Sequence, residues 1–339
     1  MEKLKRPGAM IGLAVCIVFL TACGGKQTQP LSGGAEGEKE SKEVTLKLFA
    51  AWPENNSNLV DMEKFIQKVD EKSNHTVEIV WGGGPEAIPS NQMAEAIKNG
   101  IVDVAWTAHT YNVSHIPVME GMKLTDADKM RENGGFEFVD ELYVKNLNAH
   151  YLGNVTNGLT YNLYTKKEIH TLEDFKGLTI RATPAYQAFV ESLGAGAVNT
   201  SAGEAYQALE RNVIQGYGWP SLGIKDYGWQ EVSEYIIEPA FYTVDVAVFV
   251  SDKAWNGLSE EQRKVLMQAG REVEEEAKVY YKDAIQKDRE ELIAEGMKVI
   301  PLSDDVAREY LKLADKEAWA NVLKADQVNG EKLKGYTEW

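Results

Sequence analysis

Strand patterns and helix patterns alternate along this chain of 339 residues. Three strands are predicted over Val44–Ala51, Thr76–Trp81 and Val102–Thr107, because apolar residues there alternate with polar ones or form short runs. Amphipathic helices are predicted between them, over Asn58–Glu71 and Gln92–Asn99. This alternation predicts a parallel sheet with right-handed crossover connections.

A second series of the same kind follows a long helical stretch over Thr125–Leu147. Its predicted strands and helices are Thr160–Tyr164, Leu178–Ala182, Pro184–Leu193, Gly203–Asn212 and Ile214–Trp219. The strongly alternating segment Thr243–Val250 predicts a buried strand that returns the chain to the first series. Met297–Pro301 predicts a last strand and Asp304–Lys324 a last helix.

A capping box at Ser259–Gln262 predicts the start of a helix that continues toward Ala294. A helix of about 35 residues is ~50 Å long, which is enough to run from one domain to another. We therefore predict an α/β protein of two lobes around a cleft, with this helix spanning both. Residues 44–156 and 245–285 are assigned to lobe I, and residues 157–244 and 286–339 to lobe II.

Residues 1–22 are predicted to be an export signal. A basic start at Lys3–Arg6 precedes the apolar run Ala9–Leu20, which is too short to span a bilayer. The run ends in Leu-Thr-Ala before Cys23, and this resembles a bacterial lipobox, whose cysteine is lipidated. The alternative is an ordinary signal peptide that contains a cysteine. Residues 23–43 are predicted to be a flexible tether. The protein is predicted to be extracytoplasmic and anchored to a membrane by its lipid, either in the periplasm or on the outer face of the cell membrane.

The formal net charge of −16 argues against a nucleic-acid partner, because a phosphate backbone requires clustered Lys and Arg. Motifs typical of serine hydrolases, zinc proteases, P-loops and dinucleotide binding are missing from the sequence. His109 and His115 have no third metal-ligating partner nearby in the sequence, so loop histidines are the favoured interpretation. No metal and no cofactor are predicted.

The most informative polar residue is Arg181, at the carboxyl end of the strand Leu178–Ala182. Thr183 is suited to cap the next helix and Pro184 to begin it. A guanidinium group and a helix N-terminus both favour a carboxylate at that spot. A surface salt bridge is the alternative interpretation.

Five short motifs stand out along the chain: NGIVD (99–103), LEDFKGLTIR (172–181), LGA (193–195), GEAYQALE (203–210) and NVIQGYGWP (212–220). In that order they resemble the motifs "GslDi", "dDlkGlKiR", "lGa", "sEvYtALq" and "gvvDGqenp" of the substrate-binding proteins of tripartite ATP-independent periplasmic (TRAP) transporters, the DctP family. A weaker, collinear resemblance extends from Lys47 to the end.

The resemblance implies a two-lobed receptor that closes on an organic acid and delivers it to a membrane permease without catalysis. Arg181 then corresponds to the arginine that binds the ligand carboxylate. Two other functions stay open at this point. One is a ligand-sensing subunit of a membrane receptor, and the other is an extracytoplasmic hydrolase.

The chain departs from the family pattern at positions that bear on specificity. Gln215 replaces the usual Asp, Trp219 the usual Asn, and Ala202 a frequent aromatic residue. A second family arginine corresponds to Tyr161, beside Asn162.

Aromatic residues at strand ends are expected to face the cleft. These candidates are Trp52, Trp106 with the following Thr107, Tyr161 and Trp219, and Tyr186 is a further candidate in the next helix. An aromatic box with one arginine suits a monocarboxylate that has an apolar or ring body. For each tryptophan the alternative is a place in the core between the lobes. Glu204 is expected to cap its helix rather than to reach across the cleft.

Overall fold

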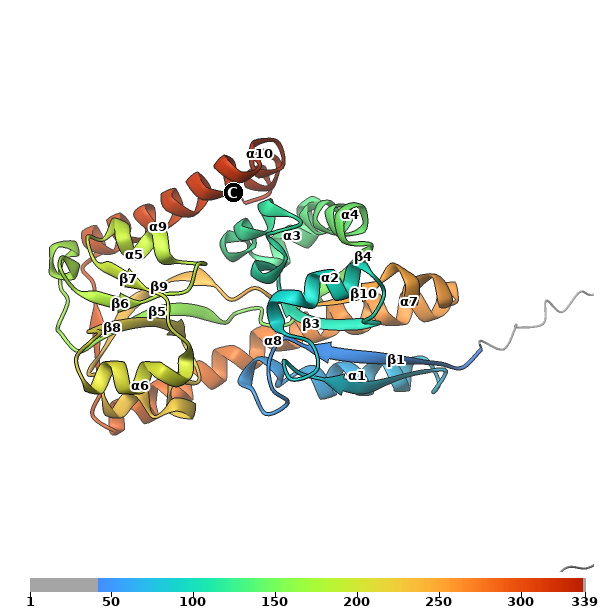
Figure 1. The fold of residues 1–339 in the computed structure, drawn as a ribbon, viewed down its shortest axis with the longest axis horizontal. Helices are drawn as coiled ribbons and strands as arrows, with labels where there is room; N and C mark the ends of the chain where they lie inside the picture. Colours follow the sequence, from blue (N-terminus) through green and yellow to red (C-terminus); the bar gives the residue numbers. More distant parts are fainter. Residues whose placement is uncertain (1–41, 338–339) are drawn as a thin grey trace, which may run out of the picture. The chain divides into compact units, whose positions relative to one another are not determined.

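The computed structural model describes residues 42–337, so the predicted signal, Cys23 and most of the tether lie outside the described residues. Within the described range the chain forms two β-sheets, each flanked by helices (Figure 1). Each sheet combines strands that are far apart in the sequence. The two predicted α/β series therefore correspond to two separate sheets.

The first sheet contains, in spatial order, β2 (Val77–Gly83), β1 (Val44–Ala50), β3 (Val104–Ala108), β10 (Val246–Ser251) and β4 (Ala149–Asn154). The strands β2, β1 and β3 are parallel, as predicted, while β10 runs antiparallel to both of its neighbours. Helices α1 (Met62–Lys72), α2 (Met93–Lys98), α3 (Ala127–Asn133), α4 (Gly135–Leu147) and α7 (Asp252–Gly257) belong to this part of the chain.

The second sheet contains, in spatial order, β11 (Lys298–Pro301), β9 (Tyr235–Thr243), β5 (Thr160–Thr165), β8 (Gly216–Pro220), β6 (Thr179–Arg181) and β7 (Gly196–Val198). The strand β5 runs antiparallel to β8 and β9, and the remaining pairs are parallel. Helices α5 (Gln187–Ser192) and α6 (Ala202–Glu210) connect its strands. Glu204 and Ser201 form a capping box, so Glu204 caps its helix as expected.

The chain passes between the two sheets at residues 155–159 and again at Val244–Asp245. The predicted buried strand Thr243–Val250 is confirmed as β10, but β10 begins only at Val246, because Thr243 is the last residue of β9 in the other sheet. The two passages are hydrogen-bonded to each other: Val155 N donates to Val246 O at 2.9 Å, and Val244 N donates to Leu159 O at 2.9 Å. We refer to residues 155–159 and 244–245 as the hinge.

The long helix α8 (Glu260–Ala294) is present as predicted, with a complete capping box between Ser259 and Gln262. Leu266 belongs to the core of the first sheet, whereas Leu292 belongs to the core of the second. The helix therefore contributes to both lobes, and Figure 1 shows it in orange running past both groups of strands.

One predicted helix is divided in two, and one further helix was not predicted. The predicted helix over Thr125–Leu147 is interrupted at Gly134, whose φ of 88° is left-handed and ends α3 before α4 begins. The predicted helix Asp304–Lys324 is confirmed as α9 (Asp304–Ala325), and α10 (Gln327–Gly335), which was not predicted, follows it. Trp319 and Leu333 from these helices lie in a core cluster of the first sheet. The lobe boundaries stay a prediction, but the last helices contact lobe I as well as lobe II.

No helix of residues 42–337 combines the length and the apolar character that are required to cross a membrane.

Candidate ligand-binding site

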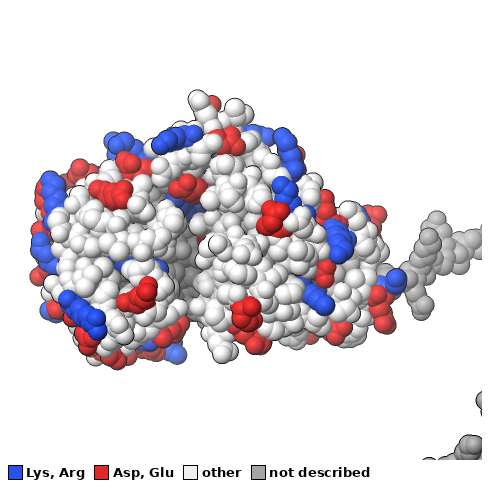
Figure 2. Space-filling view, viewed as in Figure 1, with Lys and Arg blue, Asp and Glu red and all other residues white. Residues whose placement is uncertain are grey.

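A cavity of about 560 Å³ lies between the two sheets, next to the hinge. Figure 2 shows the surface hollowed along a groove between the two halves of the described chain. Lobe I contributes residues that follow β1 and β3, and lobe II contributes residues from β5, β6 and β8. The residues that line the cavity include Trp52, Thr110, Tyr111, Glu120, Tyr161, Arg181, Tyr186, Ala202, Trp219, Tyr227 and Asp245.

Arg181 is the last residue of β6, and only 5% of its surface is exposed. Its Nε donates to Thr200 O at 3.1 Å, and its Nη1 lies 3.1 Å from Tyr186 Oη and 3.3 Å from Gly218 O. Within residues 42–337 these hydrogen bonds all go to uncharged oxygens, and none of them uses Nη2. The guanidinium carbon also lies 5.3 Å from the centre of the Trp219 ring. The structure therefore holds a buried cation at the cavity wall without an anionic partner among the described residues.

Tyr186 holds Arg181 in place. Its hydroxyl donates to Gly218 O at 2.7 Å and accepts from Arg181. The Tyr186 ring lies so close to Gly218 that a side chain at position 218 would collide with it. Glycine at this position therefore permits the contact that orients the arginine.

The prediction that a helix begins beside Arg181, at Pro184, is wrong. The helix α5 begins at Gln187, and Tyr186 rather than Thr183 occupies the capping position. The preceding residues form a turn, in which Tyr186 N donates to Thr183 O at 3.2 Å. Arg181 is thus the source of positive charge at this spot, without help from a helix end.

The aromatic wall contains three of the predicted residues, Trp52, Tyr161 and Trp219, and Ala202 also lines the cavity. Two more aromatic residues belong to it that the sequence analysis missed. Tyr111 lies 5.9 Å from Trp52 between ring centres, and Tyr227 lies 5.4 Å from Trp219. Both missed residues lie in short 3-10 helices, which carry no periodic signal that would predict their direction.

Trp106 and Thr107 do not line the cavity, contrary to expectation. All five residues of β3 are buried because this strand is central in its sheet and covered on both faces. Trp106 is 0% exposed, packs against Phe65, and donates through Nε1 to Asn58 O at 2.8 Å. It therefore belongs to the core of lobe I.

Asn162 also faces away from the cavity, although its neighbour Tyr161 lines it. Successive side chains of a strand point to opposite faces, so the two residues could not both face the ligand. Asn162 Nδ2 donates to Ile237 O at 2.8 Å, and its Oδ1 accepts from Ser221 Oγ at 2.6 Å. These contacts place it beside a second cavity.

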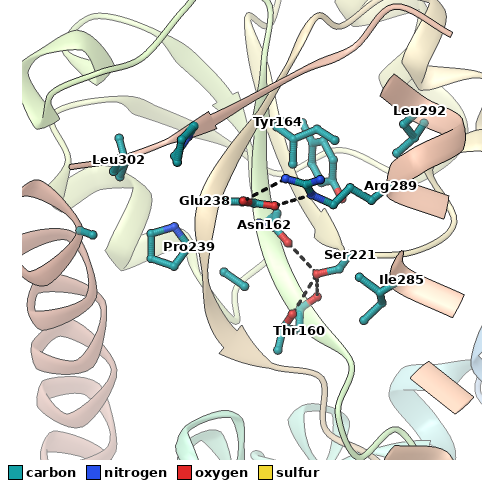
Figure 3. A pocket seen from close by; sticks show the side chains of 14 residues that line it. Thr160, Asn162, Tyr164, Ser221, Glu238, Pro239, Ile285, Arg289, Leu292 and Leu302 are labelled. Atoms are coloured by element: carbon teal, nitrogen blue, oxygen red, sulfur yellow. Dashed lines mark hydrogen bonds and ion pairs between the residues drawn. The ribbon is translucent and has the colours of Figure 1, made fainter. Parts of the chain in front are cut away.

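The second cavity has a volume of about 420 Å³ and lies between β5, β9 and α8 (Figure 3). Its charged residues pair with each other, since Arg289 Nε lies 2.9 Å from Glu238 Oε1. Thr160 and Ser221 share a hydrogen bond of 2.9 Å. Because its polar groups already satisfy one another, this cavity is a weaker candidate for a ligand than the one at Arg181.

Two buried charged residues near the larger cavity were missed by the sequence analysis. Asp245, in the hinge, is 5% exposed, and Thr110 donates to its Oδ2 from both N and Oγ1, at 3.0 and 3.1 Å. Burial raises the pKa of this carboxyl group. Lys123 is 4% exposed and lies 3.1 Å from Glu120, and its ammonium group also donates to Ala185 O in the other lobe. Neither residue stands in a motif, so only folding reveals them.

A resident metal finds no support in the described side chains. Within residues 42–337 no group of three His, Cys, Asp or Glu residues is placed to hold an ion. His109 is buried in the core of lobe I, where burial lowers its pKa to about 3, and His115 lies 3.3 Å from Glu95.

The chain is similar to known proteins in sequence and in fold. A family model described as "Bacterial extracellular solute-binding protein, family 7" matches residues 49–326. A Nostoc protein described as a monocarboxylate 2-oxoacid-binding periplasmic protein is 23% identical over 318 residues, covering 89% of this chain and 84% of that protein.

Two solved structures are similar in fold. A Bordetella pertussis extracytoplasmic solute receptor binding pyroglutamic acid has a TM-score of 0.74 at 19% identity, covering 87% of this chain and 99% of that one. A TRAP solute-binding protein from Desulfovibrio salexigens with bound orotic acid has a TM-score of 0.73 at 21% identity, covering 86% and 97%. These matches confirm the predicted two-lobed α/β architecture.

The family match also bears on whether the protein is an enzyme. Its members are extracytoplasmic receptors that bind solutes and are not enzymes, which confirms the prediction of a non-enzymatic role. The match spans most of the chain, including every strand that contributes to the cavity. The chain therefore belongs to the DctP-type bacterial extracellular solute-binding proteins, family 7.

Proposed function

We propose that this receptor binds a small organic acid in the cavity between its lobes, with Arg181 holding the carboxylate, and delivers it to a TRAP permease. The observation that carries this proposal is the buried guanidinium group at the cavity wall, whose Nη2 is hydrogen-bonded by none of residues 42–337. Leaving a charge buried and uncompensated costs several kcal/mol. A ligand carboxylate that accepts hydrogen bonds from the guanidinium group removes this cost and gains geometric specificity.

The size and walls of the cavity support a small ligand with a ring or an apolar body. Its volume of about 560 Å³ lies within the range of small-molecule sites, roughly 300–1,000 Å³. Trp52, Tyr111 and Trp219 present flat apolar surfaces beside the single arginine. The relatives described above bind 2-oxoacids, pyroglutamic acid and orotic acid, all of which are carboxylates.

The contacts between the lobes support a receptor that encloses its ligand. The Lys123 ammonium group, from lobe I, donates to Ala185 O in the loop that follows β6 of lobe II. This contact lies at the cavity, because Ala185 and the Glu120 partner of Lys123 both line it. As water leaves the cavity, the attraction between Arg181 and a carboxylate becomes stronger.

We also propose that acyl chains on Cys23 attach the receptor to a membrane. The lipobox-like residues Leu20–Cys23 after a basic, apolar start support this anchor. The mature protein would then diffuse along the membrane surface that holds the permease. Metabolic labelling with a fatty acid, detected on Cys23, tests the anchor.

Thermal unfolding in the presence of carboxylic acids tests the proposed ligand class. We expect at least one small monocarboxylate to stabilise the mature protein, by about 2.7 kcal/mol at 100 times its dissociation constant. The matched control is the primary amide of the same acid, which has nearly the same shape but no negative charge. Stabilisation by the amide equal to that by the acid, or the absence of any response across the acids, would contradict the proposal.

A further inference from the structure

We propose that the ligand carries, besides its carboxylate, a nitrogen that donates hydrogen bonds, and that Asp245 accepts them. This inference rests on the proposed function, because it concerns the other end of the molecule that Arg181 holds. The ligand class becomes small carboxylates with an ammonium or ring N–H group, rather than carboxylates in general.

The hinge presents Asp245 to the cavity. Its backbone stands between β9 and β10, where Val244 N donates to Leu159 O and His109 N donates to Asp245 O at 3.1 Å. These bonds fix the main chain on both sides of the acid, and the side chain lines the cavity while only 5% of the residue surface is exposed. Thr110 binds one carboxylate oxygen, Oδ2, with both of its donors. The carboxylate is therefore held in one orientation by residues of lobe I and the hinge.

Arg181 and Asp245 act on the same part of the cavity but do not pair with each other. Tyr161 and Tyr111 lie within electrostatic range of both, since Asp245 raises the pKa of each phenol and Arg181 lowers it, with burial as the largest cause. The cavity thus has a positive pole on lobe II and a negative pole at the hinge, with aromatic rings nearby.

The charges around Asp245 are already engaged elsewhere. Lys123 lowers the pKa of Asp245, but its ammonium group forms its contacts with Glu120 and with Ala185 O. Burial is the largest influence on Asp245 and raises its pKa. A ligand with a carboxylate alone would compensate Arg181 and bring a second negative charge toward the buried acid. A ligand that also carries a donor nitrogen at its far end compensates both poles. Its carboxylate pairs with Arg181, and the charge-assisted hydrogen bond from its nitrogen offsets the desolvation of the Asp245 carboxylate.

Sets of acids that share one carbon skeleton test the inference. One set is 4-aminobutanoate, 4-hydroxybutanoate and butanoate, and another is 4-(aminomethyl)benzoate, 4-(hydroxymethyl)benzoate and 4-methylbenzoate. Dissociation constants are measured by calorimetry on the wild-type mature protein in sodium-free, calcium-free buffer. We expect the tightest nitrogen-bearing acid to bind at least tenfold more tightly than its nitrogen-free counterpart.

The variant Asp245→Asn is expected to abolish that preference, while the nitrogen-free acid binds as well as before or better. The matched control is Asp103→Asn, because Asp103 also accepts a backbone N–H, from Lys47 at 2.9 Å, but does not line the cavity. This control should keep the wild-type preference. The wild-type series alone already tests the inference if Asp245→Asn fails to fold.

The outcomes separate this inference from the proposed function. Equal or tighter binding of the hydroxy or nitrogen-free acids would overturn the role of Asp245 and leave the carboxylate site at Arg181 standing. Binding of those acids only after addition of Na⁺ or Ca²⁺ would also overturn it, since a cation would then satisfy Asp245. A failure of every acid, with or without nitrogen, would overturn the proposed function and this inference together.

Discussion

Replacing Arg181 with glutamine is expected to weaken binding of the carboxylate ligand by about 30-fold to several-thousand-fold, equivalent to ~2–5 kcal/mol. Glutamine keeps one donor but loses the charge and the planar fork of the guanidinium group. The more conservative Arg181→Lys is expected to cost at least tenfold, since an ammonium group cannot bind both carboxylate oxygens in one plane. Calorimetric titration with the acid identified by thermal unfolding measures both effects.

The matched control for this experiment is Arg211→Gln, because Arg211 is exposed and lies outside the cavity. It should leave the affinity unchanged. The unfolding free energy of Arg181→Gln must be measured beside its affinity, because Nε and Nη1 of Arg181 also bind Thr200 O and Gly218 O. Wild-type affinity in a folded Arg181→Gln protein would refute the role of this residue.

The second large effect concerns stability. Trp106→Ala is expected to lower the free energy of unfolding by about 3–5 kcal/mol, the range for removing a large buried aromatic side chain. The residue is 0% exposed, and its Nε1 bond to Asn58 O would also be lost. Urea unfolding, monitored by far-ultraviolet circular dichroism of the backbone, measures the change in the free energy of unfolding.

Two variants make the stability result interpretable. Trp106→Phe keeps an aromatic ring in the core and should cost clearly less than Trp106→Ala. Trp52→Ala removes a tryptophan that is only partly buried and lines the cavity, so its stability cost should also be smaller. A loss below about 1 kcal/mol in Trp106→Ala would mean that the side chain is not part of a tightly packed core.

Under the proposed binding mode, the arrangement of charges would let this receptor select among acids. The arginine sits at the end of a strand in lobe II, and the acid sits in the hinge beside lobe I. A ligand that contacts both would favour the arrangement in which the lobes enclose it. Ligand recognition and closure would then depend on the same pair of opposite charges.

Many elements of the fold could be predicted because their causes are local. Apolar patterns identified the parallel strands, and the Ser259 capping box marked the start of α8 to the residue. Predictions failed where a tertiary contact or a turn overrode the pattern. Examples are the break at Gly134 and the turn that precedes α5, which begins at Gln187 instead of Pro184.

Part of the candidate site could also be predicted from the sequence, and part of it could not. The motif around Arg181 stands on one strand and its following turn, so the sequence alone determined the family resemblance, the two-lobed class and the arginine. Only the tertiary structure decided that Trp106 and Asn162 turn away from the cavity, and that Asp245, Thr110 and Tyr111 converge on it. The physical reason is that burial and charge compensation depend on neighbours distant in the chain, whereas periodicity and capping depend on residues within a few positions of each other.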